Sequence, residues 1–195
     1  MVRVDGLEYS YYIMQTELPP SALIHFEGGN SGYYSTKIEI IDDVAITSNY
    51  VKKFINNLRE ATGLKFRIPT KLEWEYAAKG GNKSKNYTYS GSNNIDEVAW
   101  YNYNCNKPQD IAKKSPNELG LYDMNGNVQE WCNDRYGDYS SLPQHNPLGP
   151  SSGCHRVLRG GSWVYGTNEC QVSIRDAWNH EHGFENHGFR LSLSL

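Results

Sequence analysis

The chain has 195 residues and a formal net charge of −3, with 38% hydrophobic and 21% charged residues. This composition is typical of a folded globular chain, and the length suits one domain with a sizeable core. No basic stripe or Arg-rich run is present, which argues against nucleic acid as a partner. No apolar run approaches the ~18 residues of a membrane span. We therefore expect one domain over residues 1–195, with neither nucleic-acid binding nor a membrane span.

Residues 1–5 lead into no apolar signal core, so we expect no signal peptide and no secretion by that route. The cysteines are widely spaced and form no CxxC pair, which argues against structural zinc. They are Cys105, Cys132, Cys154 and Cys170. Buried free thiols are expected, and one or two disulfides are the alternative.

The first half of the chain contains the regular elements. Residues 8–17 alternate in character and predict one or two strands, which end at the prolines of 19–20. A short strand-like segment follows at 37–41. A helix is predicted from Thr47 or Ser48 to Thr62, with Ser48 as its N-cap and Gly63 at the C-terminal end. Its buried face is marked by Val51, Phe54, Ile55 and Leu58.

A second helix is predicted over 71–79. Thr70 and Glu73 have the spacing of a capping box, and the glycines at 80–81 end the helix. Beyond Gly80 no further helix is expected. The remaining chain contains loops and short strands at 98–101, 120–124, 127–131, 156–159 and 188–195. This order favours an α+β fold with a small, twisted antiparallel sheet.

The segment 164–187 has neither a helical nor an alternating apolar period. It mixes Gly, Asn, His, Asp, Tyr, Trp and Phe, and ordered-looking blocks flank it on both sides. A long irregular segment inside a compact domain is usually functional or disordered. Because both ends are anchored, we expect a functional segment.

Three sequence blocks carry a resemblance to a known family. They are residues 67–81 (RIPTKLEWEYAAKGG), 117–131 (NELGLYDMNGNVQEW), and 159–163 (RGGSW) with 188–191 (GFRL). In this order they resemble the formylglycine-generating enzyme, or sulfatase-modifying factor, domain. The resemblance covers about residues 8–195 and implies a C-type-lectin-like fold with short strands and much ordered loop.

The aromatic and basic residues of these blocks have a structural interpretation. Trp74, Trp131 and Trp163 are expected to be core residues whose indole N–H groups find partners. Arg159 and Arg190 are expected to tie loops together through charge-assisted hydrogen bonds.

The resemblance also implies a test for oxidase activity. Family members that oxidise sulfatase cysteines have two active-site cysteines five residues apart, shortly after the Gly-Gly-Ser block, and Cu(I) needs two thiolates. The matching positions here are Tyr165 and Cys170. Because one thiolate is missing, we predict that the chain is not an enzyme and has no catalytic residue or required cofactor.

A related branch carries a three-His iron site in an added helical domain, which this chain lacks. His180 and His182 are close in sequence, but no HxxxH motif or carboxylate triad accompanies them. We interpret them as exposed loop imidazoles.

A calcium-binding loop of the family matches the chain at Asp123, Gly126, Val128 and Glu130. Hard oxygen ligands in a turn suit calcium. The alternatives are a structural calcium ion at this loop and a tight turn that side-chain hydrogen bonds hold.

The C-terminus is most similar to the variable proteins of diversity-generating retroelements. The resemblance implies that a reverse transcriptase miscopies the adenines of a template, and that the copy replaces the end of a lectin-fold gene. The frame of the variable region, about residues 156–191, consists of 159–163, 170–173, Arg175, 178–179 and 188–191.

The positions between the frame residues share one property: an Asn codon reaches each residue through changes at its two adenines. They are Val164, Tyr165, Gly166, Ile174, Asp176, Ala177, His180, His182, Gly183, Phe184, Asn186 and His187. Glu169, Gln171, Trp178, Glu181 and Glu185 are not reachable in this way. The predicted ligand-binding set consists of these variable positions, without Gly183 and with Trp178 as an aromatic anchor.

The sequence thus predicts a non-enzymatic, receptor-binding protein with a diversified C-terminal surface. Its expected partner is a protein or glycan on a cell surface, in the setting of a phage particle or bacterial cell surface. The alternatives are a formylglycine-generating or related metal-dependent oxidase and an inactive structural member of that family. The oligomeric state and the ligand are not indicated by the sequence.

Overall fold

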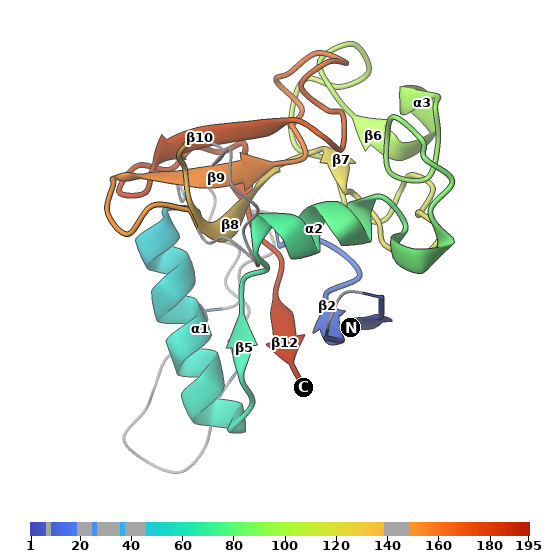
Figure 1. Cartoon of the computed structure of the whole chain (residues 1–195). Helices are drawn as coiled ribbons and strands as arrows, with labels where there is room; N and C mark the ends of the chain where they lie inside the picture. Colours follow the sequence, from blue (N-terminus) through green and yellow to red (C-terminus); the bar gives the residue numbers. More distant parts are fainter. Residues whose placement is uncertain (7–8, 19–24, 27–35, 38–45, 139–148) are drawn as a thin grey trace.

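The computed structural model describes residues 1–6, 9–18, 25–26, 36–37, 46–138 and 149–195 (Figure 1). One four-stranded sheet joins the two ends of the described chain. Its order is β1 (Val2–Val4), β2 (Tyr11–Ile13), β12 (Ser192–Ser194) and β5 (Phe66–Arg67), and every pair in it is antiparallel. Because β12 lies between β2 and β5, the C-terminal strand completes this sheet.

The second sheet carries the C-terminal region. Its order is β10 (Arg175–Asn179), β9 (His155–Arg159), β8 (Gln129–Arg135) and β11 (His187–Gly188). β10 forms one edge of this sheet, and β11 pairs with β8 in parallel. Two smaller pairs are β3 (His25–Phe26) with β4 (Thr36–Lys37), antiparallel, and β6 (Ala99–Trp100) with β7 (Asn125–Gly126), parallel.

Most strand pairs are antiparallel, as expected, but β8 with β11 and β6 with β7 are parallel. Parallel neighbours need a long crossover, and the chain makes one between β8 and β11 by way of β9 and β10. No local residue pattern reveals this return of the chain.

Two further strand predictions are wrong. Residues 120–124 are not a strand, because the Asn117 Oδ1 accepts from the N–H groups of Leu119 and Leu121 and holds a turn there. Conversely, the segment 164–187 contains β10, whose residues pair with all of β9 from Arg175↔Arg159 to Asn179↔His155. Of the segment predicted at 37–41, Lys37 lies in β4 and the rest lies outside the described residues.

The first long helix, α1 (Ser48–Thr62), buries Val51, Phe54 and Ile55 as the spacing predicts. Gly63 ends it with φ 70°, and its N–H donates to the Arg59 carbonyl. The expected N-cap is wrong by one residue, because the Thr47 Oγ1 accepts from the Tyr50 N–H at 3.1 Å and Ser48 is the first helical residue.

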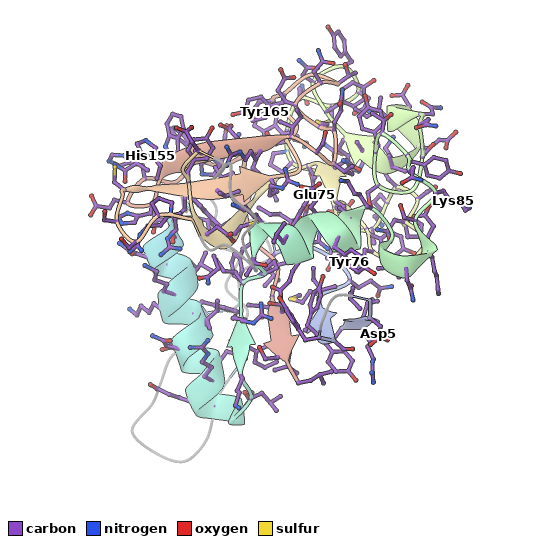
Figure 2. The ribbon with its side chains drawn as sticks, in the orientation of Figure 1. Asp5, Glu75, Tyr76, Lys85, His155 and Tyr165 are labelled. Carbon is purple, nitrogen blue, oxygen red and sulfur yellow. The ribbon has the colours of Figure 1, made fainter. Side chains whose placement is uncertain are left out.

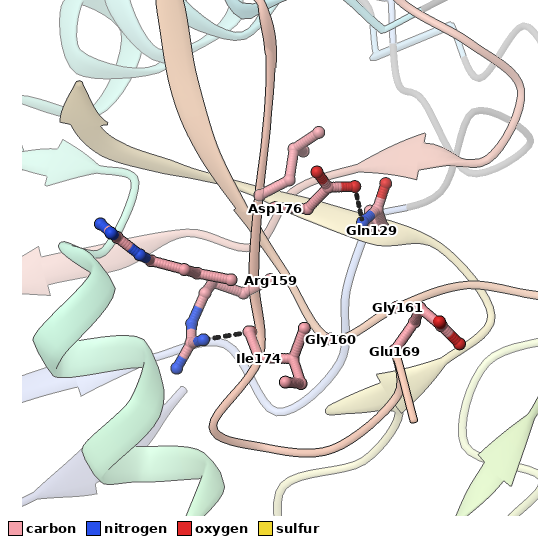
Figure 3. Close-up of a pocket in the computed structure, with 9 residues that line it drawn as sticks. Gln129, Arg159, Gly160, Gly161, Glu169, Ile174 and Asp176 are labelled. Atoms are coloured by element: carbon pink, nitrogen blue, oxygen red, sulfur yellow. Dashed lines mark hydrogen bonds between the residues drawn. The ribbon is translucent and has the colours of Figure 1, made fainter. Parts of the chain in front are cut away.

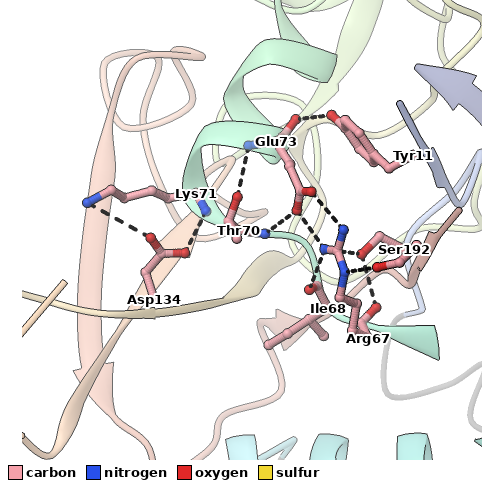
Figure 4. Close-up of polar contacts among 9 residues, drawn as sticks. Tyr11, Arg67, Ile68, Thr70, Lys71, Glu73, Asp134 and Ser192 are labelled. Atoms are coloured by element: carbon pink, nitrogen blue, oxygen red, sulfur yellow. Dashed lines mark hydrogen bonds and ion pairs between the residues drawn. The ribbon is translucent and has the colours of Figure 1, made fainter. Parts of the chain in front are cut away.

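The second helix, α2 (Lys71–Ala78), begins with the predicted capping box. The Thr70 hydroxyl accepts from the Glu73 N–H, and the Glu73 carboxylate accepts from the Thr70 N–H (Figure 4). Arg67 donates to both Glu73 oxygens at 2.6 and 2.7 Å, which fastens β5 to the helix. Beyond Gly80 the described chain contains only a 3₁₀ turn, η2 (Gly81–Lys83), and the four-residue α3 (Ile95–Val98).

The second sheet packs against both α1 and α2. One face packs on α2, where Trp74 shares a buried cluster with Cys132 and Val157. The other face packs on α1, where Phe54 shares a cluster with Trp131 and Leu158. Because Val157 and Leu158 are neighbours on β9, strand alternation sends them to opposite faces. The sheet is therefore a rigid platform for its edge strand β10.

All four cysteines are free thiols. The expected burial is correct for Cys132 and Cys170 and wrong for Cys105, which is half-buried, and Cys154, which is exposed. None of the described helices is long and apolar enough to cross a bilayer.

Candidate ligand-binding surface

Arg159 fixes the start of β10 to α2. Its guanidinium pairs with the Glu75 carboxylate at 2.6 Å and donates to the carbonyls of Val172, at 2.9 Å, and Ile174. Arg159 is buried, so this ion pair is shielded from water on one side. Figure 2 shows Glu75 on the sheet side of α2 and Tyr76 on the side of Asp5. The role predicted for Arg159 is confirmed.

Arg190 ties together segments far apart in sequence. It makes two charge-assisted bonds to Glu130 at 2.6 and 2.7 Å and donates to the carbonyls of Met14 and Tyr122, each at 3.1 Å. The indole of Trp74 donates to the same Glu130 carboxylate at 2.7 Å. The predicted role of Arg190 is confirmed as well.

Two of the three predicted core tryptophans behave as expected. Trp74 and Trp131 are fully buried, and Trp131 donates its Nε1–H to the Ile46 carbonyl at 2.9 Å. The prediction is wrong for Trp163, which is only half-buried and whose Nε1 has no hydrogen-bond partner among the described residues.

The matched calcium loop is occupied by protein contacts. Both Glu130 oxygens bind Arg190, and one of them also binds Trp74. The Asp123 carboxylate accepts from the Ala112 N–H at 2.7 Å. Within the described ranges no three His, Cys, Asp or Glu side chains are arranged to hold a metal ion. The carboxylates of Asp123 and Glu130 are therefore engaged by protein donors, and side-chain hydrogen bonds hold this turn.

A third buried carboxylate, Glu17, adds negative charge beside this network. Burial, together with the charges of Asp123 and Glu130, raises the pKa of Glu17 well above its usual value, and burial also raises the pKa of Asp123. Three carboxylates thus lie near one guanidinium, that of Arg190, and the raised pKa values of Glu17 and Asp123 favour the protonated forms of these two groups.

The surroundings of Cys170 do not favour a thiolate. Its side chain is buried, and burial raises the pKa of the thiol to about 12. Tyr165, five residues before Cys170, packs against the cluster that contains Tyr89, Tyr101 and Cys170.

The residues predicted to bind ligand fall into three groups. Val164, Ile174, Trp178, His182 and Phe184 are exposed. Tyr165, Gly166, Asp176, Ala177, His180 and the neighbouring Gly183 are half-buried. Asn186 and His187 are buried. Tyr165 lies on the outer side of β10, at the opposite end of the molecule from Asp5 (Figure 2).

The expectation that the whole set faces outward is therefore wrong for Asn186 and His187. The Asn186 side-chain amide donates to the Ser162 hydroxyl at 3.2 Å, and the Asn186 backbone carbonyl accepts from the Gln129 backbone N–H. The His187 ring is packed edge-on against Trp131 at 5.3 Å. Burial lowers the pKa of His187 to about 4, so the ring is neutral near pH 7. The side chains of both residues support the surface from below.

A row of rings connects the core to the surface. Trp131, His187, Phe184 and Trp178 follow one another, with centroid distances of 5.3, 5.4 and 5.2 Å. The first two rings are buried, whereas Phe184 is 46% and Trp178 40% exposed. The exposed pair is thus an apolar contact surface on a fixed base.

Beside these rings lies an open pocket of about 220 Å³ (Figure 3). It is lined by Gln129, Leu158, Arg159, Gly160, Gly161, Glu169, Ile174, Arg175 and Asp176. The Gln129 amide donates to the Asp176 carboxylate at 3.1 Å. Gln129 and Glu169 are not among the predicted binding residues. No sequence pattern indicates that the Gln129 side chain at the start of β8 reaches Asp176 on β10, and Glu169 is not reachable from an Asn codon.

Comparisons with known proteins agree with this architecture. Residues 27–195 match the family described as the sulfatase-modifying factor enzyme 1-like domain. Over 160 residues the chain is 37% identical to the chaperone protein LppX of Paenibacillus barcinonensis, covering 72% of this chain and 53% of that protein. It is 33% identical over 149 residues to the formylglycine-generating enzyme of Streptomyces coelicolor, covering 65% and 46%. The chain therefore spans about half the length of these two relatives.

A solved structure, that of Treponema denticola variable protein 1, superposes with a TM-score of 0.78 at 28% identity, covering 95% of this chain and 85% of that chain. These matches confirm the predicted resemblance to the enzyme family and to the variable proteins. They also confirm the predicted C-type-lectin-like fold. The chain belongs to the sulfatase-modifying factor enzyme 1-like domain family.

Proposed function

We propose that this protein is a non-enzymatic, ligand-binding protein whose C-terminal surface is diversified by a retroelement. The observation that carries the proposal is the exposed pair of Trp178 and Phe184, held on a buried base by His187 and Trp131. Exposed aromatic clusters mark interaction sites, and rigid rings bind with a small loss of conformational entropy.

The arrangement of variable and fixed positions supports the same function. Val164, Ile174 and His182 are exposed, so they can change with little effect on packing. The frame residues Arg159, Cys170 and Arg190 are buried and hold the loops. A scaffold of this kind separates folding from recognition, as antibody loops do. The proposed partner is a protein or glycan on another cell's surface.

The proposal is tested first in the DNA beside the gene. We expect a second, shorter copy of the sequence that encodes the C-terminal segment, next to a reverse-transcriptase gene. Adenines in that copy should stand at the codons where sibling genes differ. Differences spread evenly over buried and exposed positions would exclude diversification.

A matched set of variants tests whether the surface can vary freely. Replacement of Val164, Ile174 and His182 by Asn together should change the free energy of unfolding by no more than about 0.5 kcal/mol per site. The control, Val157→Asn, places an amide in the buried core and should cost several times more. Urea unfolding measures both, and an equal loss would mean that these three side chains are core.

The oxidase activity of relatives supplies the opposing outcome. Copper-dependent conversion of a cysteine-containing sulfatase peptide, lost in Cys170→Ala, would overturn the non-enzymatic assignment. We expect no conversion, because the Cys170 thiol is buried and its position five residues upstream is Tyr165.

A further inference from the structure

The pocket near Trp178 is lined by acidic side chains, which indicate the kind of ligand group that it binds. An inference about that group rests on the proposed binding function. Two carboxylates line the pocket, Asp176 on β10 and Glu169 in the loop before it. Among the described residues, neither carboxylate forms a salt bridge with Lys, Arg or His. The Asp176 carboxylate accepts hydrogen bonds from the Gln129 Nε2 and from the Ala177 N–H, and no cationic side chain of the described residues pairs with it or with Glu169.

The two arginines that also line the pocket direct their charges elsewhere. The Arg159 guanidinium is bound by Glu75 and by the carbonyls of Val172 and Ile174. In Figure 3 Arg159 extends toward the Ile174 carbonyl and away from the Asp176–Gln129 pair. Arg175 donates to the Gly137 carbonyl at 2.8 Å and stacks on the Tyr136 ring. Strand alternation sends Arg175 and Asp176 to opposite faces of β10.

Gln129 supplies an independent indication of a ligand. It lines the pocket and is 3% exposed, and its Nε2 donates to Asp176. Its Oε1 has no hydrogen-bond partner in the described part of the chain. A buried polar atom without a partner costs free energy, so a donor group from a ligand would be stabilised there. The pocket therefore offers hydrogen-bond acceptors to a ligand that carries donors.

The walls of the pocket suit an aliphatic stem. Leu158 and Ile174 contribute apolar side chains, and Gly160 and Gly161 line the pocket without side chains. Lys and Arg bury their methylene stems against apolar walls while their charged ends bind acceptors. Exposed Phe184 and Trp178 lie near the same edge strand and favour a protein surface.

We propose that this pocket binds a lysine or arginine side chain of a protein ligand, with Asp176, Glu169 and the Gln129 carbonyl oxygen receiving its charged end. Glu169 cannot arise from an Asn codon, whereas Asp176 and Ile174 can. Gln129 lies outside the variable region, so two of the three acceptors are fixed, and the variable residues Asp176 and Ile174 tune the pocket.

Defined small probes test the assignment on the whole chain. N-acetyl-arginine methylamide and its uncharged citrulline isostere are titrated to about 10 mM, so that a site with a Kd near 1 mM would be largely filled. NMR follows the Gln129 side-chain amide and the backbone amides of Ile174 and Asp176. We expect saturable shifts with the arginine probe, weaker at high salt, and at least about tenfold weaker binding of the citrulline probe.

Variants locate the response. Asp176→Asn and Glu169→Gln keep the shape of each side chain and should each weaken arginine binding by about tenfold. The control Glu60→Gln removes one exposed carboxylate from α1 and should leave binding unchanged. Equal binding of arginine and citrulline, no shift at these amides, or unchanged binding by both variants would overturn the assignment.

These outcomes are separable from the failure of the proposed function. A cell-surface ligand whose binding is lost in Phe184→Asn but unchanged in Asp176→Asn would leave a binding protein with a different pocket occupant. A basic probe that binds while the gene has no template copy would leave the pocket without diversification.

Discussion

Among single residues, His187 shows how burial changes chemistry. An Asn codon reaches His through changes at its adenines, so the sequence assigns His187 to the variable surface. The ring nevertheless lies between Trp131 and Phe184, and the residue is 2% exposed. Its Nδ1 has no hydrogen-bond partner among the described residues. Burial without a compensating partner disfavours the charged form, and the pKa falls from 6.5 to about 4.

This shift predicts a pH dependence of stability. Between pH 6.5 and pH 4, His187 is protonated in the unfolded chain and neutral in the folded protein. The free energy of unfolding therefore falls as the pH falls through this window. His187→Phe keeps an aromatic ring and should remove about 2 kcal/mol of the loss between pH 7 and pH 5. Urea unfolding of both proteins at the two pH values measures the difference, and a difference that does not change with pH would contradict the buried neutral ring.

Among the elements, the helix starts follow local chemistry closely. The capping box at Thr70 and Glu73 is evident in sequence and present in the structure, since both partners lie within one turn. The start of α1 is less certain from sequence, because Thr47 and Ser48 are both good caps. The backbone at Thr47 is extended, with ψ 156°, and this conformation makes Thr47 the N-cap.

A pair of alanine variants tests this assignment. Thr47→Ala should cost about 1 kcal/mol of unfolding free energy, because the Tyr50 N–H loses its acceptor. Ser48→Ala should cost nothing or stabilise slightly, because its buried hydroxyl has no partner among the described residues. Urea unfolding distinguishes the two; an equal cost at both positions would assign the cap to neither alone.

The second sheet shows what element patterns miss. β10 lacks an alternating apolar pattern because it is an edge strand with one neighbour, and its residues are half-buried or exposed. Its conformation is imposed by the backbone of β9 and by Arg159, which holds the Val172 and Ile174 carbonyls. Only the partner strand makes this segment regular.

Across the whole molecule, Arg190 joins the core to both ends of the described chain. It is fully buried and contacts Glu130, the Met14 carbonyl and the Tyr122 carbonyl. The charge of Glu130 raises the pKa of Arg190, although burial alone would lower it, and the guanidinium stays charged. Arg190 and Glu130 thus connect distant parts of the chain through buried hydrogen bonds.

Loss of this guanidinium should be severe. Arg190→Met would leave the buried Glu130 carboxylate without its cationic partner, beside Glu17 and Asp123, at a cost of about 3–5 kcal/mol. The double variant with Glu130→Met should recover part of that loss, because it removes the unpaired charge. Arg3→Met, which breaks an exposed pair with Asp5, should leave the urea midpoint almost unchanged. If Arg190→Met behaved like Arg3→Met, the buried pair would have no structural role.

The sequence by itself determined the family, the two long helices with their buried faces, and the roles of Arg159 and Arg190. These depend on contacts within one helical turn or on long motifs, which are readable along the chain. Tertiary structure alone decided that β11 runs parallel to β8, that β10 is a strand, that Asn186 and His187 are inside, and that Gln129 lies below Asp176. Such features depend on which distant backbone lies alongside a residue, and chain pairing over tens of residues leaves no local pattern. The binding surface therefore has its position from the sequence and its pocket from the fold.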